Sequence, residues 1–130
     1  MDISVSLQCN ASLCQAQLQT GPRRQALTFT STGQGCAVNG GELLLLALTT
    51  CYCNDLYREA QQRGIRIDAI SVSASARFPG VGLAATDIRY HAQIDSPATP
   101  AQLQRLLEHT DSVAEVHNTV RSGCMVQRTP

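Results

Sequence analysis

The run from Gly40 to Leu56, GGELLLLALTTCYCNDL, constrains the fold of this chain more than any other segment. Its four consecutive leucines, Leu43 to Leu46, make the start apolar almost all round, which predicts a helix whose first half is covered by protein on every side. Cys51 lies in the middle of this expected helix. A thiol in that place is either a packed core residue or a shielded redox nucleophile, and the two alternatives indicate different proteins.

The limits of this helix are marked by local signals. Asn39 is a candidate N-cap, with Glu42 in the first turn behind it. Gly64 is expected to end the helix after about 22 residues, because glycine readily takes the backbone conformation that follows a last turn. The segment 31–41, rich in Gly, Ser and Thr, is expected to be a loop.

Alternating apolar and polar residues predict strands on both sides of the helix. Three short strands, expected at 3–7, 13–18 and 25–30, would form an N-terminal meander. Two longer period-two stretches, 65–78 and 83–94, are separated by Pro79-Gly80 and indicate a hairpin.

Two helices and one strand are expected after the hairpin. Pro100 is expected to open the first helix, and 113–120 forms the second. Gly123 would end it, and 124–127 would return as a final strand. With 130 residues and 43% apolar content, the chain has room for one core, so we expect an α+β fold in a single domain, 1–130.

Charge and hydropathy narrow the classes of partner and the cell compartment. Ten basic residues, all arginine, balance ten acidic ones without any block of like sign, so neither nucleic acid nor a membrane surface is an expected partner. The absence of lysine excludes Schiff-base chemistry. The longest apolar segment, Leu43 to Leu48, is too short to span a bilayer, and no signal peptide is visible. We expect a cytoplasmic protein.

The cysteines and histidines do not match a metal-binding pattern. The six cysteines have no zinc spacing and are expected to be free, mostly buried thiols; they are Cys9, Cys14, Cys36, Cys51, Cys53 and Cys124. His109 and His117 would lie about 80° apart on one unbroken helix, which does not favour chelation. We expect no metal site and no cofactor. Asp111 and Ser112 are expected to cap the last helix rather than to act in catalysis.

The neighbours of Cys51 on the helix do not activate its thiol. Cys53 is turned about 200° away, so the two cannot form a disulfide without unwinding the helix. Asp55, one turn on, would raise the pKa of the thiol, whereas Arg58, two turns on, would lower it. The nearer charge is expected to have the larger effect.

The run GGELLLLALTTCYCNDLYREAQQRGI resembles the cysteine helix of the OsmC/Ohr family, with Asn39, Glu42, Leu43 and Cys51 fitting the pattern. The order of expected elements is also similar to that family along nearly the whole chain. The resemblance implies an intertwined homodimer whose two long helices cross at its centre. It also implies a thiol peroxidase that reduces organic hydroperoxides in oxidative-stress defence, with Cys51 as the peroxidatic nucleophile.

The chain departs from the family pattern at the groups that assist this cysteine. A register on Val116, Asn118 and Thr119 puts Ala114 where the family has its second, resolving cysteine. Shifted registers put Ser112 or Asp111 there, and none of these registers yields a cysteine. Gly41 falls at the position of the Ohr glutamate, with Glu42 beside it as the candidate catalytic carboxylate. The first turn, 9–11, offers no arginine, which leaves Arg23 or Arg24 as substitutes.

Two functions are therefore open. The first is a one-cysteine hydroperoxide reductase, with Cys51 as nucleophile and a low-molecular-weight or protein thiol as reductant. The second is a family member without peroxidase activity that binds an apolar ligand or partner at the dimer interface. A measured pKa of Cys51 well below the free value of about 8.5 would favour the first.

Overall fold

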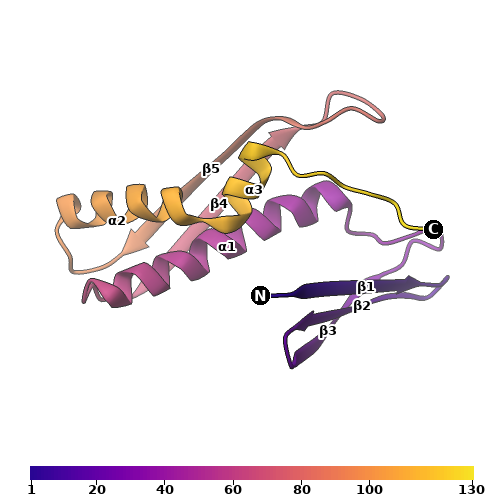
Figure 1. Ribbon diagram of the computed structural model, residues 1–130, viewed down its shortest axis with the longest axis horizontal. Helices are drawn as coiled ribbons and strands as arrows, with labels where there is room; N and C mark the ends of the chain where they lie inside the picture. Colours follow the sequence, from indigo (N-terminus) through magenta and orange to yellow (C-terminus); the bar gives the residue numbers. More distant parts are fainter. The chain divides into compact units, whose positions relative to one another are not determined.

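The computed structural model describes residues 1–130, which divide into two compact units, Met1–Leu43 and Leu44–Pro130. Strands and helices follow one another in the α+β order that the sequence predicts (Figure 1). They are β1 (Ile3–Cys9), β2 (Leu13–Thr20), β3 (Arg23–Thr30), α1 (Gly40–Gln62), β4 (Ala69–Arg77), β5 (Thr86–Asp95), α2 (Pro100–Val113) and α3 (Glu115–Ser122). None of the helices is long and apolar enough to cross a membrane.

The N-terminal unit is the expected antiparallel meander, in the order β1-β2-β3. Its register pairs Cys9 with Cys14 across the first turn, and Cys14 with Phe29 on the other side. Asn10 holds this turn, because its side-chain oxygen accepts from the backbone N–H groups of Ser12 (2.8 Å) and Leu13 (2.9 Å). The two cysteines therefore face each other at the end of the β1-β2 hairpin.

Helix α1 begins and ends at the residues that the sequence indicates. The side chain of Asn39 accepts from the N–H of Glu42 at 2.8 Å, and the carboxylate of Glu42 accepts from the N–H of Asn39 at 3.0 Å. This reciprocal pair is a capping box. At the other end Gly64 has a φ of +64°, and the N–H of Ile65 reaches back to the carbonyl of Ala60 at 2.9 Å. That bond is typical of a glycine-terminated helix.

The leucine run is not covered on every side within one chain, so that expectation is wrong for the chain described here. Leu46 is 58% exposed, whereas Leu48 is 3% exposed. The buried positions of α1 recur at helical spacing and include Tyr52 and Leu56, which puts a single face of the helix against the core.

In the C-terminal unit, one apolar core joins the helices to a two-stranded sheet. Strands β4 and β5 pair antiparallel, with Ile70 opposite Ile94 and Val72 opposite Ala92. In Figure 1, α1 and α2 run alongside this hairpin. The buried core cluster comprises Tyr52, Leu56, Ala60, Leu106 and Ala114, and Cys51 is among the half-buried residues packed against it.

Three expected strand segments, 65–68, 83–85 and 124–127, are not formed. β4 starts at Ala69 instead of residue 65, because Ile65 and Ile67 are used to pack against the core after the helix ends. The expected final strand at 124–127 is also absent. Met125 is 81% and Val126 94% exposed, and the sheet contains only β4 and β5, so this segment has no strand beside it to complete a ladder.

The two C-terminal helices are separated at Ala114, and the expected caps of the second helix are wrong. Ala114 is the N-cap residue of α3 and makes no side-chain capping bond. The hydroxyl of Ser112 instead donates to the carbonyl of His109 at 2.6 Å. Asp111 accepts from Arg121 at 2.6 Å and from the hydroxyl of Tyr90. Asp111 and Ser112 therefore bond to other partners and do not cap α3.

Candidate functional site

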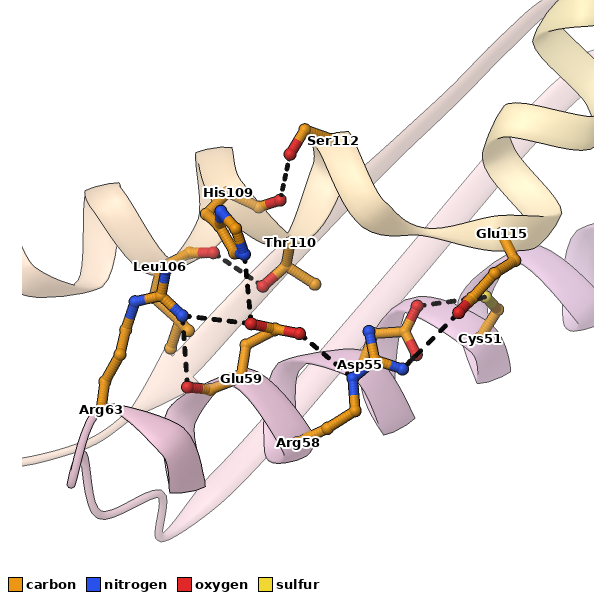
Figure 2. Close-up of polar contacts among 10 residues, drawn as sticks. All are labelled: Cys51, Asp55, Arg58, Glu59, Arg63, Leu106, His109, Thr110, Ser112 and Glu115. Carbon is orange, nitrogen blue, oxygen red and sulfur yellow. Dashed lines mark hydrogen bonds and ion pairs between the residues drawn. The ribbon is translucent and has the colours of Figure 1, made fainter.

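Cys51 lies half-buried on α1 beside the start of α3 (Figure 2). Its thiol donates to a carboxylate oxygen of Asp55 at 3.4 Å. A carboxylate oxygen of Glu115 lies 4.0 Å from the same sulfur. The sulfur thus has one acidic neighbour from its own helix, as the spacing predicts, and a second from α3.

Arg58 connects the carboxylates around the thiol. Its guanidinium bonds Asp55 at 2.9 Å and Glu59 at 3.1 Å, and lies 3.7 Å from Glu115. Glu59 also binds Arg63 at 3.2 Å and His109 at 3.1 Å, which extends the network along α1 and α2 (Figure 2). Arg58, which was expected to lower the pKa of Cys51, therefore forms ion pairs with these carboxylates.

These surroundings disfavour ionisation of the thiol. Burial raises the pKa of Cys51, and the charges of Asp55 and Glu115 raise it further. The backbone N–H of Val116 acts in the opposite direction and lowers that pKa. Burial likewise raises the pKa of the Asp55 carboxyl. The site consequently pairs a weakly acidic thiol with an adjacent carboxylate of increased basicity.

Glu115 is the site residue that sequence reasoning misses. The register that puts Ala114 at the second-cysteine position makes Glu115 the next residue, but only the fold shows that its side chain reaches Cys51. Ala114 itself is fully buried where α2 ends and α3 begins. The register expected from the resemblance, which puts the second-cysteine position at Ala114, was a signal for this proximity.

The other residues expected to assist Cys51 in catalysis lie in the N-terminal unit. Glu42 uses its carboxylate in the capping box of α1, and Arg23 and Arg24 lie at the start of β3. The catalytic role expected of Glu42, and the replacement of the family arginine by Arg23 or Arg24, stay predictions.

The cysteines differ from the six free thiols that the sequence predicts. Cys9 and Cys14 form a disulfide across the β1-β2 pair, because the register brings their Cα atoms to 4.1 Å. Cys36, Cys51, Cys53 and Cys124 are free. Cys53 lines a shallow pocket with Thr49, Thr50, Asn54 and Val72, so its surroundings differ from those of Cys51.

Two of the three histidines, His117 and His109, take part in packing and ion pairing. His117 is buried, with its ring centroid 4.6 Å from that of Tyr90 and 5.5 Å from that of Tyr52. Neither of its ring nitrogens has a hydrogen-bond partner, and burial lowers the pKa of this imidazole. His109 pairs with Glu59. Neither histidine lies in a group of candidate metal ligands.

Comparison with known proteins identifies the family. The model of the OsmC family, described as OsmC-like protein, matches residues 32–128. The chain belongs to this family. The matched segment contains Cys51 and the whole of the C-terminal network around it. No curated protein matches this OsmC-like chain.

Solved structures have the same fold at low identity. A crystal structure of a hypothetical protein from Aquifex aeolicus VF5 has a TM-score of 0.72 at 15% identity, covering 95% of this chain and 89% of that one. An OsmC-like protein from Mycoplasma pneumoniae has a TM-score of 0.66 at 18% identity, covering 92% and 86%. An organic hydroperoxide resistance protein OsmC from Legionella pneumophila has a TM-score of 0.65 at 14% identity, covering 93% and 90%.

The carboxylate of Glu115 is expected to make Cys51 harder to ionise. Glu115→Gln removes one negative charge and should lower the pKa of the thiol, which raises the rate of Cys51 alkylation at pH 7 by about two- to fivefold, the range for exposed charges. Alkylation by iodoacetamide, followed across pH by peptide mass spectrometry, measures both effects. Glu108→Gln is the matched control on α2, and an equal acceleration there would contradict the assignment.

Proposed function

We propose that this OsmC-like protein reduces organic hydroperoxides, with Cys51 as the nucleophile and an external thiol as the reductant. The observation that carries the proposal is the bond from the half-buried thiol of Cys51 to Asp55, a buried carboxylate held by Arg58. A thiol with a raised pKa needs a proton acceptor within reach as it attacks, and Asp55 meets that need. The Legionella relative, an organic hydroperoxide resistance protein, supports the same class of reaction.

The proposed reaction balances with the residues at the site. The sulfur of Cys51 attacks the terminal oxygen of the hydroperoxide, an S–O bond forms and the O–O bond breaks. The thiol proton passes to Asp55 and then to the departing alkoxide, which leaves as an alcohol. Cys51 becomes a sulfenic acid. Two external thiols then reduce it, giving their disulfide, one water and the free thiol of Cys51.

Trapping the sulfenic acid tests this proposal directly. The reduced protein is treated with one equivalent of cumene hydroperoxide in the presence of a 1,3-diketone, and its peptides are mapped by mass spectrometry. We expect the adduct on Cys51. An unmodified Cys51, with no hydroperoxide consumed in the presence of monothiol or dithiol reductants, would contradict the proposal.

The variant Glu42→Gln separates the expected catalytic role of Glu42 from its role in capping, because glutamine also completes a capping box.

A second candidate function rests on the raised pKa of Cys51. A thiol whose pKa is raised by burial and by neighbouring carboxylates also suits a family member without peroxidase activity, which binds an apolar ligand or partner at a dimer interface. An unreactive Cys51 in the trapping experiment would favour this function.

The proposal includes a single OsmC-like domain over 1–130 that works in the cytoplasm as an intertwined homodimer. Exposed apolar side chains support a partner subunit, since Ile3 and Val5 are each 62% exposed and Leu46 is 58% exposed. Light scattering coupled to size-exclusion chromatography measures this state. A mass near that of one 14.0 kDa chain at micromolar concentration would contradict the dimer.

Ala114→Cys is expected to supply the missing resolving thiol. The start of α3 lies against Cys51, so we expect hydroperoxide to generate a disulfide between Cys51 and the introduced cysteine, in place of a lasting sulfenic acid. Peptide mapping without reductant detects it. Because Ala114 is fully buried, the variant is also expected to lose about 1–3 kcal/mol of stability.

Ala101→Cys is the control for this variant, since position 101 is an exposed alanine on the same helix pair. A disulfide from Cys51 to that control position would show that chain mobility, and not the placement of residue 114, determines the pairing. No disulfide in either variant would place residue 114 out of reach of Cys51.

A further inference from the structure

We propose that Cys9, Cys14 and Cys36 form a binding site for one soft metal ion of the Zn²⁺ class when the first two are reduced. The three sulfurs lie within 4.8 Å of one another. The sulfur of Cys36 is 3.3 Å from that of Cys9. Two thiolates on one tetrahedral zinc ion, with Zn–S bonds of about 2.3 Å, have sulfurs about 3.8 Å apart, so small movements would bring all three onto one ion.

The backbone around these sulfurs is held in place by hydrogen bonds. The side chain of Asn10 fixes the turn between Cys9 and Cys14. The hydroxyl of Ser31 donates to the carbonyl of Asn10 at 2.7 Å and so ties the loop containing Cys36 to that turn. An isolated bridge between Ser31 and Cys36 closes the same loop. A site of this kind requires little ordering when the ion binds.

The donor set determines which ions fit. It consists of sulfur alone, which favours soft ions such as Zn²⁺ over Mg²⁺, Ca²⁺ or Mn²⁺. Cys14 is fully buried, Cys36 half-buried and Cys9 exposed, so the ion would be fixed on one side and open to solvent on the other. Three protein ligands leave the fourth position of a tetrahedral zinc ion to water. The spacing of these cysteines along the chain matches no zinc motif, because strand register and a loop bring them together.

Metal binding and the Cys9–Cys14 disulfide exclude each other, since the disulfide uses two of the three ligands. A phosphine reductant opens the bond. The disulfide gains two electrons and two protons as thiols, while the phosphine becomes its oxide with oxygen taken from water. The thiols release protons when the ion binds, so affinity is expected to rise with pH.

Cobalt and zinc titrations of the full chain test the site. The phosphine-reduced protein is titrated anaerobically with Co²⁺, whose bonds to thiolate give near-ultraviolet charge-transfer bands, and Zn²⁺ is then added in competition with a chromophoric chelator. We expect one equivalent of either ion to bind. Cys36→Ser and Cys36→Ala should each weaken metal affinity at least about tenfold. Mutation of residues that only hydrogen-bond to a metal ligand already causes a loss of that size. The disulfide form should bind neither ion.

Two controls locate the ion. Cys124→Ser removes an exposed free thiol, and Cys51→Ser removes the sulfur of the other candidate ligand group, Cys51 with Asp55 and Glu115. Both variants should bind as the wild type does. Absent charge-transfer bands in the reduced wild type, unchanged affinity in both Cys36 variants, or loss of binding in Cys51→Ser would each overturn the proposal. Far-ultraviolet circular dichroism checks that the variants are folded.

Discussion

Cys51→Ser should lower the rate of hydroperoxide reduction by at least about a hundredfold, to that of the thiol reductant alone, because removing a nucleophile leaves only residual catalysis. Serine is close to cysteine in size and shape, but its hydroxyl is a far weaker acid than a thiol. It also forms no stable product that corresponds to the sulfenic acid. Asp55 would still be present to accept a proton, so the variant isolates the sulfur. Hydroperoxide consumption with a monothiol and with a dithiol reductant measures the loss.

Cys53→Ser is the matched control, since this free cysteine is also half-buried and lies on the same helix. It should keep the activity of the wild type, because its turn of about 200° along the helix takes it away from Asp55 and Glu115. Activity retained in Cys51→Ser but lost in Cys53→Ser would move the nucleophile to the other face of α1. Activity retained in both variants would contradict a cysteine on this helix as the nucleophile.

Leu106→Ala is expected to reduce the free energy of unfolding by about 2–5 kcal/mol, as cavity-forming substitutions in protein cores do. Leu106 is fully buried on α2 and packs in the cluster with Tyr52 and Leu56 of α1. The core is small, so few neighbouring side chains can move to fill the space. Urea unfolding at a fixed protomer concentration measures the change, which keeps any contribution from dimerisation constant.

Leu83→Ala makes the same chemical change at a position that is 59% exposed in the loop between β4 and β5. Its expected cost is below about 0.5 kcal/mol, as for most surface substitutions. If Leu106→Ala costs no more than this control, α2 does not contribute to the core as described.

The sequence predicted a structural feature well where that feature depends on neighbouring residues in the chain. Asn39, Glu42 and Gly64 set both ends of α1, because capping and helix termination involve neighbouring residues only. The final strand at 124–127 failed for the opposite reason. The residues of a segment cannot by themselves supply the neighbouring strand that a ladder requires.

The same distinction applies to the site. Helical spacing predicted that Asp55 would lie beside Cys51. Glu115 comes from another helix, and its approach depends on how α3 packs, which no spacing reveals. The Cys9–Cys14 disulfide depends on strand register, and register is not fixed by composition or by cysteine count.

The break at Ala114 decides how one backbone amide is used. In a continuous helix, the N–H of Val116 would bond to the carbonyl of Ser112. That carbonyl instead accepts from the side chain of Asn118 at 3.1 Å, and the N–H of Val116 acts on the sulfur of Cys51. The N–H of Val116 can thus either continue the helix or stabilise negative charge on the sulfur of Cys51. The chain gives up this backbone bond between α2 and α3, and the freed amide lowers the pKa of the Cys51 thiol instead.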